Sequence, residues 1–257
     1  MSPGTRRLGL AVLAAFWAVG CLPARFAASS PEDGAVSPCL GGGAVGAADA
    51  GCTPSRPILS CDVTNARDLG GVPLGASGSV ACGTLFRGPP LASLSASGCV
   101  DAAALGLHTV IDLRTSAERG ALPDDACVGA NVVSAPLPIP YDVDGTDYVA
   151  DFDTDASIAS VFHALGDAAT YPVYLHCTYG RDRTGVVAAA VLLALGASRA
   201  DVVEEYTLSA PTVGAYPQSL EAVLDEIERR GGINAALAAK GVTADELAAL
   251  RARAIAT

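Results

Sequence analysis

The apolar residues of this chain fall into short β-branched runs and longer Ala/Leu-rich runs, which predict strands alternating with helices. Strands are expected where apolar runs stand between turn-forming Gly, Pro, Asn or Asp residues, and helices where apolar residues recur at helical spacing. Thr243, with Glu246 three residues later, has the pattern of a capping box. The expected strands are 58–63, 80–87, 108–113, 131–139 and 173–175, and the expected helices are 91–105, 158–165, 186–195, 200–209, 217–230 and 243–256.

The first twenty residues have the pattern of an export signal. Arg6 and Arg7 precede an apolar run of 13 residues, 8–20, which is shorter than the roughly 20 residues of a membrane-spanning helix. The run ends in Ala-Val-Gly-Cys, which is similar to a bacterial lipobox, although the first position is more often Leu. We expect a lipoprotein-type signal peptide over 1–20 and a lipid on Cys21. Ordinary signal cleavage nearby and twin-arginine export are the alternatives.

The rest of the chain divides by composition. Residues 21–56 are rich in Ala, Gly, Ser and Pro, which is typical of a flexible tether. Residues 57–257 suffice for one domain, and the hydrophobic content of 51% can build its core. The net charge of −11 argues against nucleic acid and against adhesion to anionic membranes. We therefore expect an exported protein held on the outer face of a bacterial membrane through its lipid only.

The candidate chemistry lies in the stretch 171–187. A short apolar strand runs into a loop that carries Cys177 and, six positions later, Arg183, and an apolar helix follows. The first amides of a helix have no intrahelical partner and collect anions. We predict that the amides of 178–183 and the Arg183 guanidinium hold a phosphate. Gly180 and Gly185 let the backbone approach and turn. The predicted phosphate-binding residues are Thr178, Tyr179, Gly180, Arg181, Thr184 and Gly185.

Cys177 is the predicted nucleophile. Helix-end amides and a nearby guanidinium lower a cysteine pKa from about 8.5 to somewhere in the range of about 3.5–7.5, which favours the thiolate. Asp182 is placed to protonate a departing oxygen and later to activate water. Thr184 can hydrogen-bond the sulfur as it leaves. A buried core cysteine is the alternative, but a core position would not be followed by Arg-Asp-Arg.

Other polar residues are predicted to support the loop. Asp112 and Arg114 stand at the end of strand 108–113, and open α/β sheets place ligands at that edge. His176 can hold the loop backbone through its ring N–H. Arg67 and Asp68, in a predicted turn, either form a structural salt bridge or wall the pocket.

The loop His176-Cys177-x-x-Gly180-x-Asp182-Arg183-Thr184-Gly185 resembles the HCxxGKDRTG signature of cysteine-dependent tyrosine and dual-specificity phosphatases. It is most similar to the bacterial branch typified by the secreted mycobacterial protein-tyrosine phosphatase B. Further segments resemble that branch in the same order: NxRDLGG at 65–71, an LxRS-like strand at 85–88, VIDLRxxxE at 110–118 and the closing helices from 206 to 243. The resemblance covers roughly 56–255.

This resemblance implies a three-layer α/β fold with a mostly parallel central sheet flanked by helices. It also implies phosphomonoester hydrolysis through a cysteinyl-phosphate, with no metal and no cofactor. Arg181 stands where the branch usually has Lys, a cation associated there with phosphoinositide as well as phosphoprotein turnover. Arginine keeps the charge but changes its shape. Phosphorylated protein is the expected substrate, and phosphoinositide is the alternative. A non-catalytic phosphate-binding lipoprotein and a sulfur-transfer or arsenate-reducing enzyme are the rival classes.

An acidic stretch, 141–153, lies where many tyrosine phosphatases carry a mobile acid loop. Asp142 or Asp144 is therefore an alternative general acid to Asp182, and a solvated lid or a calcium-stiffened loop is a further interpretation. We favour Asp182 because the stretch lacks a Trp-Pro-Asp pattern and the aspartate in the loop matches the branch.

The cysteine count fits an oxidising compartment. Without Cys21 and Cys177, six of the eight cysteines remain, which suits three disulfides. Sequence alone leaves the pairing open. The pairs we expect are Cys39–Cys52, Cys61–Cys82 and Cys99–Cys127.

Overall fold

The computed structural model describes residues 52–59, 61–138 and 147–256. Its described strands form one sheet in the order β1-β2-β5-β3-β4. Only the β1–β2 pair is antiparallel, and β2, β5, β3 and β4 are parallel neighbours. The mostly parallel sheet predicted above is confirmed. The strands are β1 Arg67–Asp68, β2 Leu85–Gly88, β3 Thr109–Asp112, β4 Asn131–Ser134 and β5 Val173–His176.

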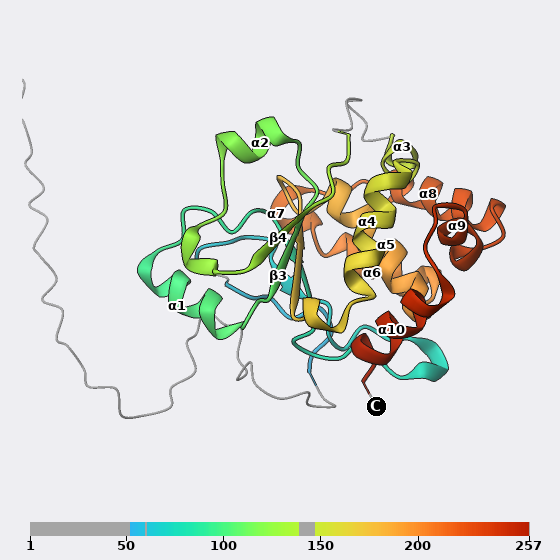
Figure 1. Ribbon diagram of the computed structural model, residues 1–257, viewed down its shortest axis with the longest axis horizontal. Helices are drawn as coiled ribbons and strands as arrows, with labels where there is room; N and C mark the ends of the chain where they lie inside the picture. Colours follow the sequence, from blue (N-terminus) through green and yellow to red (C-terminus); the bar gives the residue numbers. More distant parts are fainter. Residues whose placement is uncertain (1–51, 60, 139–146, 257) are drawn as a thin grey trace, which may run out of the picture. The chain divides into compact units, whose positions relative to one another are not determined.

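Helices cover both faces of this sheet, which gives the three layers expected (Figure 1). The α-helices are α1 Ala96–Ala104, α2 Ser116–Ala121, α3 Tyr148–Phe152, α4 Asp155–Leu165, α5 Asp182–Leu195, α6 Arg199–Thr207, α7 Ala210–Val213, α8 Pro217–Arg229, α9 Ile233–Ala239 and α10 Ala244–Ala254. Single turns of 3-10 helix are η2 Gly75–Ser77, η3 Ala126–Val128 and η4 Ala168–Thr170.

Side chains alternate between the two faces of the sheet along each strand, and this divides the hydrophobic core into two clusters. Leu175 and Ile111 point to the larger cluster, which is built around the almost wholly buried helix α5. Phe86, Val110 and Tyr174 point to the smaller cluster beside α1. Because successive strand residues face opposite sides, short and fully buried strands can serve both layers. In Figure 1, α1 lies on one side of the strands and α4, α5 and α6 lie on the other.

Several element predictions were wrong in extent. The described residues of 58–63 form no strand, because the chain turns at Leu59, whose carbonyl accepts from the amides of Asp62 and Val63. Their apolar side chains still enter the smaller cluster. The predicted turn at 67–68 is instead the edge strand β1. Strand β4 ends at Ser134, although the amides of Ala135 and Leu137 still donate to the carbonyls of Asp112 and Leu113 beyond its end.

Helix caps follow the predictions more closely. Ser95 caps α1 by accepting from the amide of Gly98, so the helix begins at Ala96 and not at 91. The capping box of Thr243 with Glu246 is confirmed at α10. The short helices α2, α3, α7 and α9 were not predicted.

One of the three expected disulfides is confirmed. Cys99 bonds Cys127, but Cys52 bonds Cys82. The pairs Cys39–Cys52 and Cys61–Cys82 were therefore wrong. The reason is packing, because the backbone around Cys52 lies against Gly70, where an added Cβ would meet the Cys82 Cα at 2.6 Å and the Cys52 Sγ at 2.9 Å. Cys61 is also disulfide-bonded.

The predicted export signal, Cys21 and most of the tether lie outside the described residues, as do Asp142 and Asp144. The described end of the tether, residues 52–56, is attached to the domain. Besides the Cys52–Cys82 bond, the Ser55 amide donates to the Gly70 carbonyl and Arg56 pairs with Asp68 at 3.1 Å. In the described part of the chain, no helix has the length and apolar character needed to cross a bilayer.

Candidate active site

The 177–183 loop joins β5 to α5 at the carboxyl edge of the sheet. Gly88, His176 and Asp112 end their strands side by side there. Cys177 follows β5 directly and is 1% exposed, and Arg183 is the second residue of α5 and is 4% exposed. Arg183 lies near enough to Cys177 that, against the effect of burial, the sulfur together with Glu118 raises the pKa of the guanidinium. The two residues on which the predicted chemistry depends are therefore brought together.

The loop can form because Gly180 has no side chain. Its φ is +65°, a conformation that other residues rarely adopt. A Cβ at this position would lie 2.3 Å from the carbonyl carbon of Gly88. Gly185 has a different reason, since a Cβ there would lie 2.7 Å from the ring of Tyr206. Both glycines are needed for close approach, as predicted.

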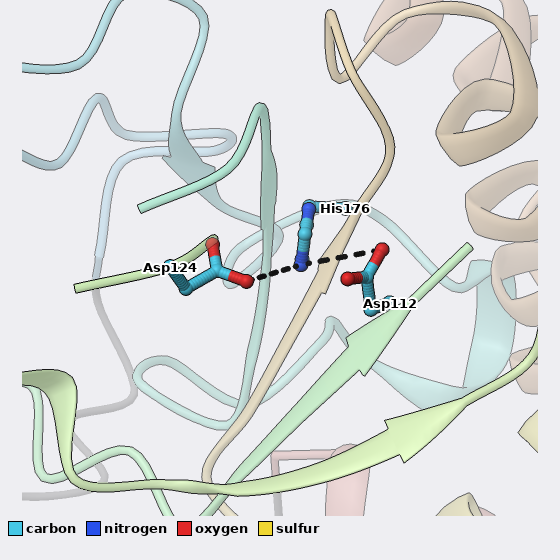
Figure 2. A group of neighbouring side chains, drawn as sticks. All are labelled: Asp112, Asp124 and His176. Carbon is cyan, nitrogen blue, oxygen red and sulfur yellow. Dashed lines mark ion pairs between the residues drawn. The ribbon is translucent and has the colours of Figure 1, made fainter. Parts of the chain in front are cut away.

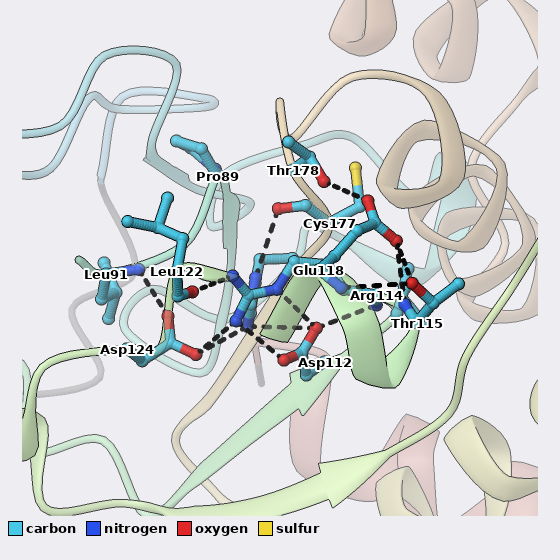
Figure 3. Close-up of polar contacts among 12 residues, drawn as sticks. Pro89, Leu91, Asp112, Arg114, Thr115, Glu118, Leu122, Asp124, Cys177 and Thr178 are labelled. Carbon is cyan, nitrogen blue, oxygen red and sulfur yellow. Dashed lines mark hydrogen bonds and ion pairs between the residues drawn. The ribbon is translucent and has the colours of Figure 1, made fainter. Parts of the chain in front are cut away.

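Glu118, at the third position of α2, holds Arg183 by a two-pronged contact. The Nη1 and Nη2 atoms of Arg183 donate to Oε2 at 2.9 Å and to Oε1 at 2.6 Å. The hydroxyl of Thr178 donates to Oε1 at 2.5 Å. Figure 3 shows the bond between Thr178 and Glu118. The bonds from Arg183 outweigh partial burial and hold the pKa of Glu118 well below its ordinary value.

Sequence reasoning treated Glu118 only as the last letter of a motif. A signal was present, because Thr115 and Glu118 form the capping box of α2 and so fix where the carboxylate stands. The pairing with Arg183, 65 residues away, needed the fold.

Behind the loop lies a cluster of the buried residues Asp112, Arg114 and His176 with the half-buried Asp124. Arg114 donates to both Asp112 oxygens, at 3.0 and 2.9 Å, and to Asp124 at 3.0 Å. His176 Nε2 points between the two carboxylates, 3.4 Å from Asp124 and 3.8 Å from Asp112 (Figure 2). Its Nδ1 lies 3.3 Å from the Cys177 carbonyl oxygen. The predicted supporting residues Asp112, Arg114 and His176 therefore stand under the loop, and Asp124 was missed.

The same three side chains, Asp112, Asp124 and His176, are of the types that bind metals and lie within 4.8 Å of one another. Both carboxylates already accept hydrogen bonds from Arg114, whose charge would repel a cation. We therefore interpret this cluster as a support for the loop.

A second buried network braces the loop from the other side. Glu205 of α6 accepts from Arg67 Nε and from Arg87 Nη1, each at 2.6 Å. Arg87 Nη2 donates in turn to the Gly180 carbonyl at 2.7 Å. Burial would raise the pKa of Glu205, but the two guanidinium groups outweigh it and the pKa is lowered. Neither Glu205 nor Arg87 had been singled out from the sequence.

For Arg67 and Asp68 the sequence left open a structural salt bridge or a role in walling the pocket, and the structure gives the two residues different roles. Arg67 belongs to the brace and reaches the loop through Asn65, whose side-chain amide donates to the Tyr179 carbonyl at 3.0 Å. Asp68 takes the structural role, since it accepts from the amides of Gly70 and Gly83, both at 2.8 Å, and pairs with Arg56.

Asp182 and Arg181 are engaged with each other at the start of α5. Arg181 donates to Asp182 Oδ1 at 2.7 Å and to Oδ2 at 3.2 Å, and the Tyr148 hydroxyl also donates to Oδ1. Arg181 further donates to the Val213 carbonyl and lies 4.6 Å from the ring centre of Tyr216. The charge of Arg181 is thus largely satisfied within the protein.

Four side chains near the loop carry buried polar atoms with no hydrogen-bond partner among the described residues, namely Thr184, Asp151, Arg87 at Nε and His176 at Nε2. Thr184 Oγ1 is buried and makes no bond, so the predicted bond to the Cys177 sulfur is not formed in this structure. Both carboxylate oxygens of Asp151, in α3, are buried and unpartnered. Unpartnered buried polar atoms are rare in proteins and are often explained by function. Sequence reasoning had not singled out Asp151.

Comparison with known proteins agrees with this geometry. A model described as the tyrosine phosphatase family matches residues 60–256. A Cupriavidus necator protein named as a tyrosine-protein phosphatase is 29% identical over 164 residues, which cover 56% of this chain and 59% of that protein. The chain thus spans about three fifths of that relative's length. Triple specificity protein phosphatase PtpB of Mycobacterium tuberculosis is 29% identical over 193 residues, covering 58% of this chain and 67% of that protein.

Solved structures show more distant likenesses. P. aeruginosa TpbA has 23% sequence identity and a TM-score of 0.41, over 62% of this chain and 87% of that one. The core catalytic domain of the S. cerevisiae PP-IP phosphatase SIW14 has 16% identity and a TM-score of 0.38, over 60% of this chain and 89% of that one.

Proposed function

The chain belongs to the tyrosine phosphatase family and is a phosphomonoesterase, and from this premise we propose that it dephosphorylates phosphotyrosine in proteins through a cysteinyl-phosphate intermediate. The observation that carries the proposal is the meeting of Cys177 and Arg183 on one buried loop whose amides open a helix. In the first step the Cys177 thiolate attacks phosphorus and the bond to the leaving oxygen breaks. In the second step water attacks phosphorus and releases the sulfur.

Arg183 and the loop amides are proposed to stabilise the transferring phosphoryl group. Charge develops on its oxygens during transfer, and donors held in advance stabilise that charge without having to reorganise. Glu118 keeps the guanidinium plane of Arg183 oriented before substrate arrives. The Glu205–Arg87 brace holds the loop at the Gly180 carbonyl. The role of Asp182 as the group that protonates the leaving oxygen stays a prediction from sequence.

Phosphoprotein is favoured over phosphoinositide by the position of Arg181. A second phosphate group would need a free cation beside the loop, and Arg181 is engaged by Asp182, the Val213 carbonyl and the Tyr216 ring. Tyr179, which is 57% exposed, offers an aromatic surface on the loop to an aryl phosphate. The mycobacterial relative is named a triple specificity protein phosphatase, so substrates other than phosphotyrosine belong in the test.

Substitution of the nucleophile tests this function. Purified Cys177→Ser is expected to lose turnover of p-nitrophenyl phosphate and of a phosphotyrosine peptide, because serine at this position is not ionised, while it still binds vanadate. A substrate panel with phosphoserine peptides and phosphoinositides, run on the unsubstituted protein, ranks the substrate classes. Normal turnover by Cys177→Ser would disprove the proposed mechanism.

We also propose that the protein is exported and anchored by a lipid on Cys21, on the strength of the leader pattern alone. Metabolic labelling with a fatty acid is expected to mark the intact protein and not Cys21→Ser. A soluble, unlabelled mature protein would favour ordinary signal cleavage.

A further inference from the structure

Residues 52–58, the edge segment, lie along strand β1 on the side away from β2. Two amides of the edge segment donate to carbonyls within 66–70, at 3.2 and 3.0 Å, and one of its carbonyls accepts from the Asp68 amide at 2.8 Å. Pro57 stands opposite Arg67 in an antiparallel bridge. Strand β1 is therefore paired on both sides, with β2 and with the edge segment.

The disulfide between Cys52 and Cys82 fixes the edge segment covalently. A further link is the ion pair of Arg56 with Asp68 at 3.1 Å. Backbone pairing over so few residues is a weak attachment by itself. The disulfide spans a sequence separation of 30 residues, and such a bond limits the alternative conformations open to the chain. Both cysteines are half-buried, so a small dithiol can reach the bond that keeps the segment in place.

Strand β1 also carries the side chain that connects to the catalytic loop. The Arg67 guanidinium is buried and begins two routes of hydrogen bonds. On the first, Glu205 accepts from Arg67 and from Arg87, each at 2.6 Å, and Arg87 donates to the Gly180 carbonyl at 2.7 Å. On the second, Arg67 donates to Asn65 at 2.7 Å, and the Asn65 side-chain amide donates at 3.0 Å to the carbonyl just before that of Gly180. The position of β1 thus sets two consecutive carbonyls of the loop.

Fixing these carbonyls also fixes the amides that follow them. A trans peptide is planar, so the carbonyl of one residue and the amide of the next point in opposite directions. The carbonyls of Tyr179 and Gly180 are held on the side of the brace, which turns the amides of Gly180 and Arg181 the other way. Both amides belong to the set predicted to hold the phosphate. Donors that are aligned in advance stabilise a transferring phosphoryl group without having to reorganise.

We propose that the Cys52–Cys82 disulfide is a redox switch of catalysis, which keeps the loop amides aligned while it is closed. The proposal rests on the function proposed above. A dithiol opens the switch: one thiolate attacks a cysteine sulfur, the sulfur–sulfur bond breaks, and the second thiol releases the reductant as a cyclic disulfide. Two electrons and two protons pass to Cys52 and Cys82. The edge segment then leaves β1, Arg67 loses the backbone opposite it, and the loop amides lose their fixed direction. Reoxidation reverses the change, and Cys177 takes no part in it.

This switch makes the phosphatase fully active only where disulfides persist, which is outside a reducing cytoplasm. The double variant Cys52→Ser/Cys82→Ser tests it without a reductant. Its affinity for vanadate and its kcat/KM for p-nitrophenyl phosphate are each expected to fall at least about tenfold, because the loop amides are no longer aligned. Isothermal titration and steady-state kinetics measure the two effects.

The matched control is Cys99→Ser/Cys127→Ser, which removes the disulfide between α1 and η3. Asp124 and Asp125, just before η3, keep their own bonds to backbone amides, at 2.7 and 2.6 Å. The control should therefore keep vanadate affinity and kcat/KM within about threefold of the unsubstituted protein. Urea denaturation is expected to show lower stability for both double variants, so a stability loss alone does not account for the difference between them.

Two results would overturn the switch. One is vanadate binding and turnover by Cys52→Ser/Cys82→Ser at the level of the unsubstituted protein. The other is an equal loss of vanadate affinity in both double variants, which would mean that general loosening of the fold is responsible. Absence of turnover in the unsubstituted oxidised protein would refute the proposed function instead, and the vanadate comparison would still test the switch.

The unsubstituted protein provides an independent measurement should Cys52→Ser/Cys82→Ser fold poorly. It is titrated with dithiothreitol, and one part of each sample is assayed for vanadate affinity after the reductant is removed. The other part is alkylated with N-ethylmaleimide and mapped by mass spectrometry. Vanadate affinity is expected to fall in step with alkylation of Cys52 and Cys82 and to recover on reoxidation. Unchanged affinity in samples whose Cys52–Cys82 bond is open would disprove the switch.

Discussion

At the scale of single residues, the site depends on one guanidinium held by one carboxylate. Glu118 accepts from both Nη atoms of Arg183 and from the Thr178 hydroxyl. Since the pKa of Glu118 is held below its ordinary value, the pair is intact at neutral pH and is lost only as pH falls through that lowered value. Glu118 is therefore expected to stay ionised and to hold Arg183 over the whole neutral pH range.

Glu118→Gln tests this arrangement. The amide keeps the shape but loses the charge and one acceptor, so Arg183 is less well oriented. We expect kcat/KM for p-nitrophenyl phosphate to fall about tenfold, which corresponds to about 1.4 kcal/mol. Thr115→Ala is the control, because it weakens the cap of α2 while leaving the Glu118 carboxylate to Arg183. Equal losses in the two variants would mean that only the cap matters.

At the scale of elements, the loop backbone is set by its close approach to β2. Gly180 combines a φ of +65° with a Cβ position 2.3 Å from the carbonyl carbon of Gly88. Gly106 has nearly the same φ, +61°, but nothing within 4 Å of its Cβ position. Gly180 and Gly106 therefore have nearly the same backbone strain, but only Gly180 has a clash.

Gly180→Ala is expected to displace the loop and to weaken vanadate binding at least about 100-fold. Gly106→Ala should cost only the strain of a left-handed residue, about 1 kcal/mol of stability, and should leave vanadate binding unchanged. Isothermal titration with vanadate and urea denaturation measure the two effects. Tight vanadate binding by Gly180→Ala would show that the loop can relax around a side chain.

The contact of α6 with β1 and β2 rests on Glu205, which is fully buried between Arg67 and Arg87. Removing the charge from one partner of a buried pair leaves the others uncompensated, which costs about 3–5 kcal/mol. Glu205→Gln is expected to lower the unfolding free energy by an amount in that range and to reduce phosphatase activity, since Arg87 also holds the Gly180 carbonyl. Glu204→Gln, at the exposed neighbouring position, should change the unfolding free energy by no more than about 0.5 kcal/mol. It should leave phosphatase activity unchanged. A stable and fully active Glu205→Gln would contradict the brace.

At the scale of the whole molecule, the burial of Asp151 makes stability depend on pH. Its pKa rises from 3.8 to about 8 on folding, so the folded protein binds the proton more tightly than the unfolded chain. This contribution is fully present below pH 3.8 and is lost as pH rises through about 8. Over that window it is on the order of a few kcal/mol.

Urea denaturation between pH 5 and pH 8 measures this dependence. The unfolding free energy of the unsubstituted protein is expected to fall toward pH 8 more steeply than that of Asp151→Asn, because the amide cannot ionise. Parallel pH dependences would mean that Asp151 is not protonated in the folded state.

The sequence by itself determined which residues form the loop and predicted their chemistry. Cys177, Gly180 and Arg183 lie within seven residues, between a strand and a helix that their own apolar patterns predict. The backbone conformation of such a short segment depends mainly on its own residues, so the proposed nucleophile, the cation and the glycine requirement could be predicted locally. The strand at 58–63 could not be excluded in this way, because its apolar side chains are buried whether the chain is extended or turned.

Only the tertiary structure decided which distant side chains serve the loop. Glu118 pairs with Arg183, 65 residues away, and Glu205 pairs with Arg67, 138 residues away. Cys82 forms its disulfide with Cys52 and not with Cys61, the partner expected from the sequence. The different environments of Asp151 and Asp182 also appear only once α3 packs against α5. The physical reason is that burial, ion pairing and disulfide proximity depend on the packing of whole elements, while a sequence pattern reports only the preferences of neighbouring residues.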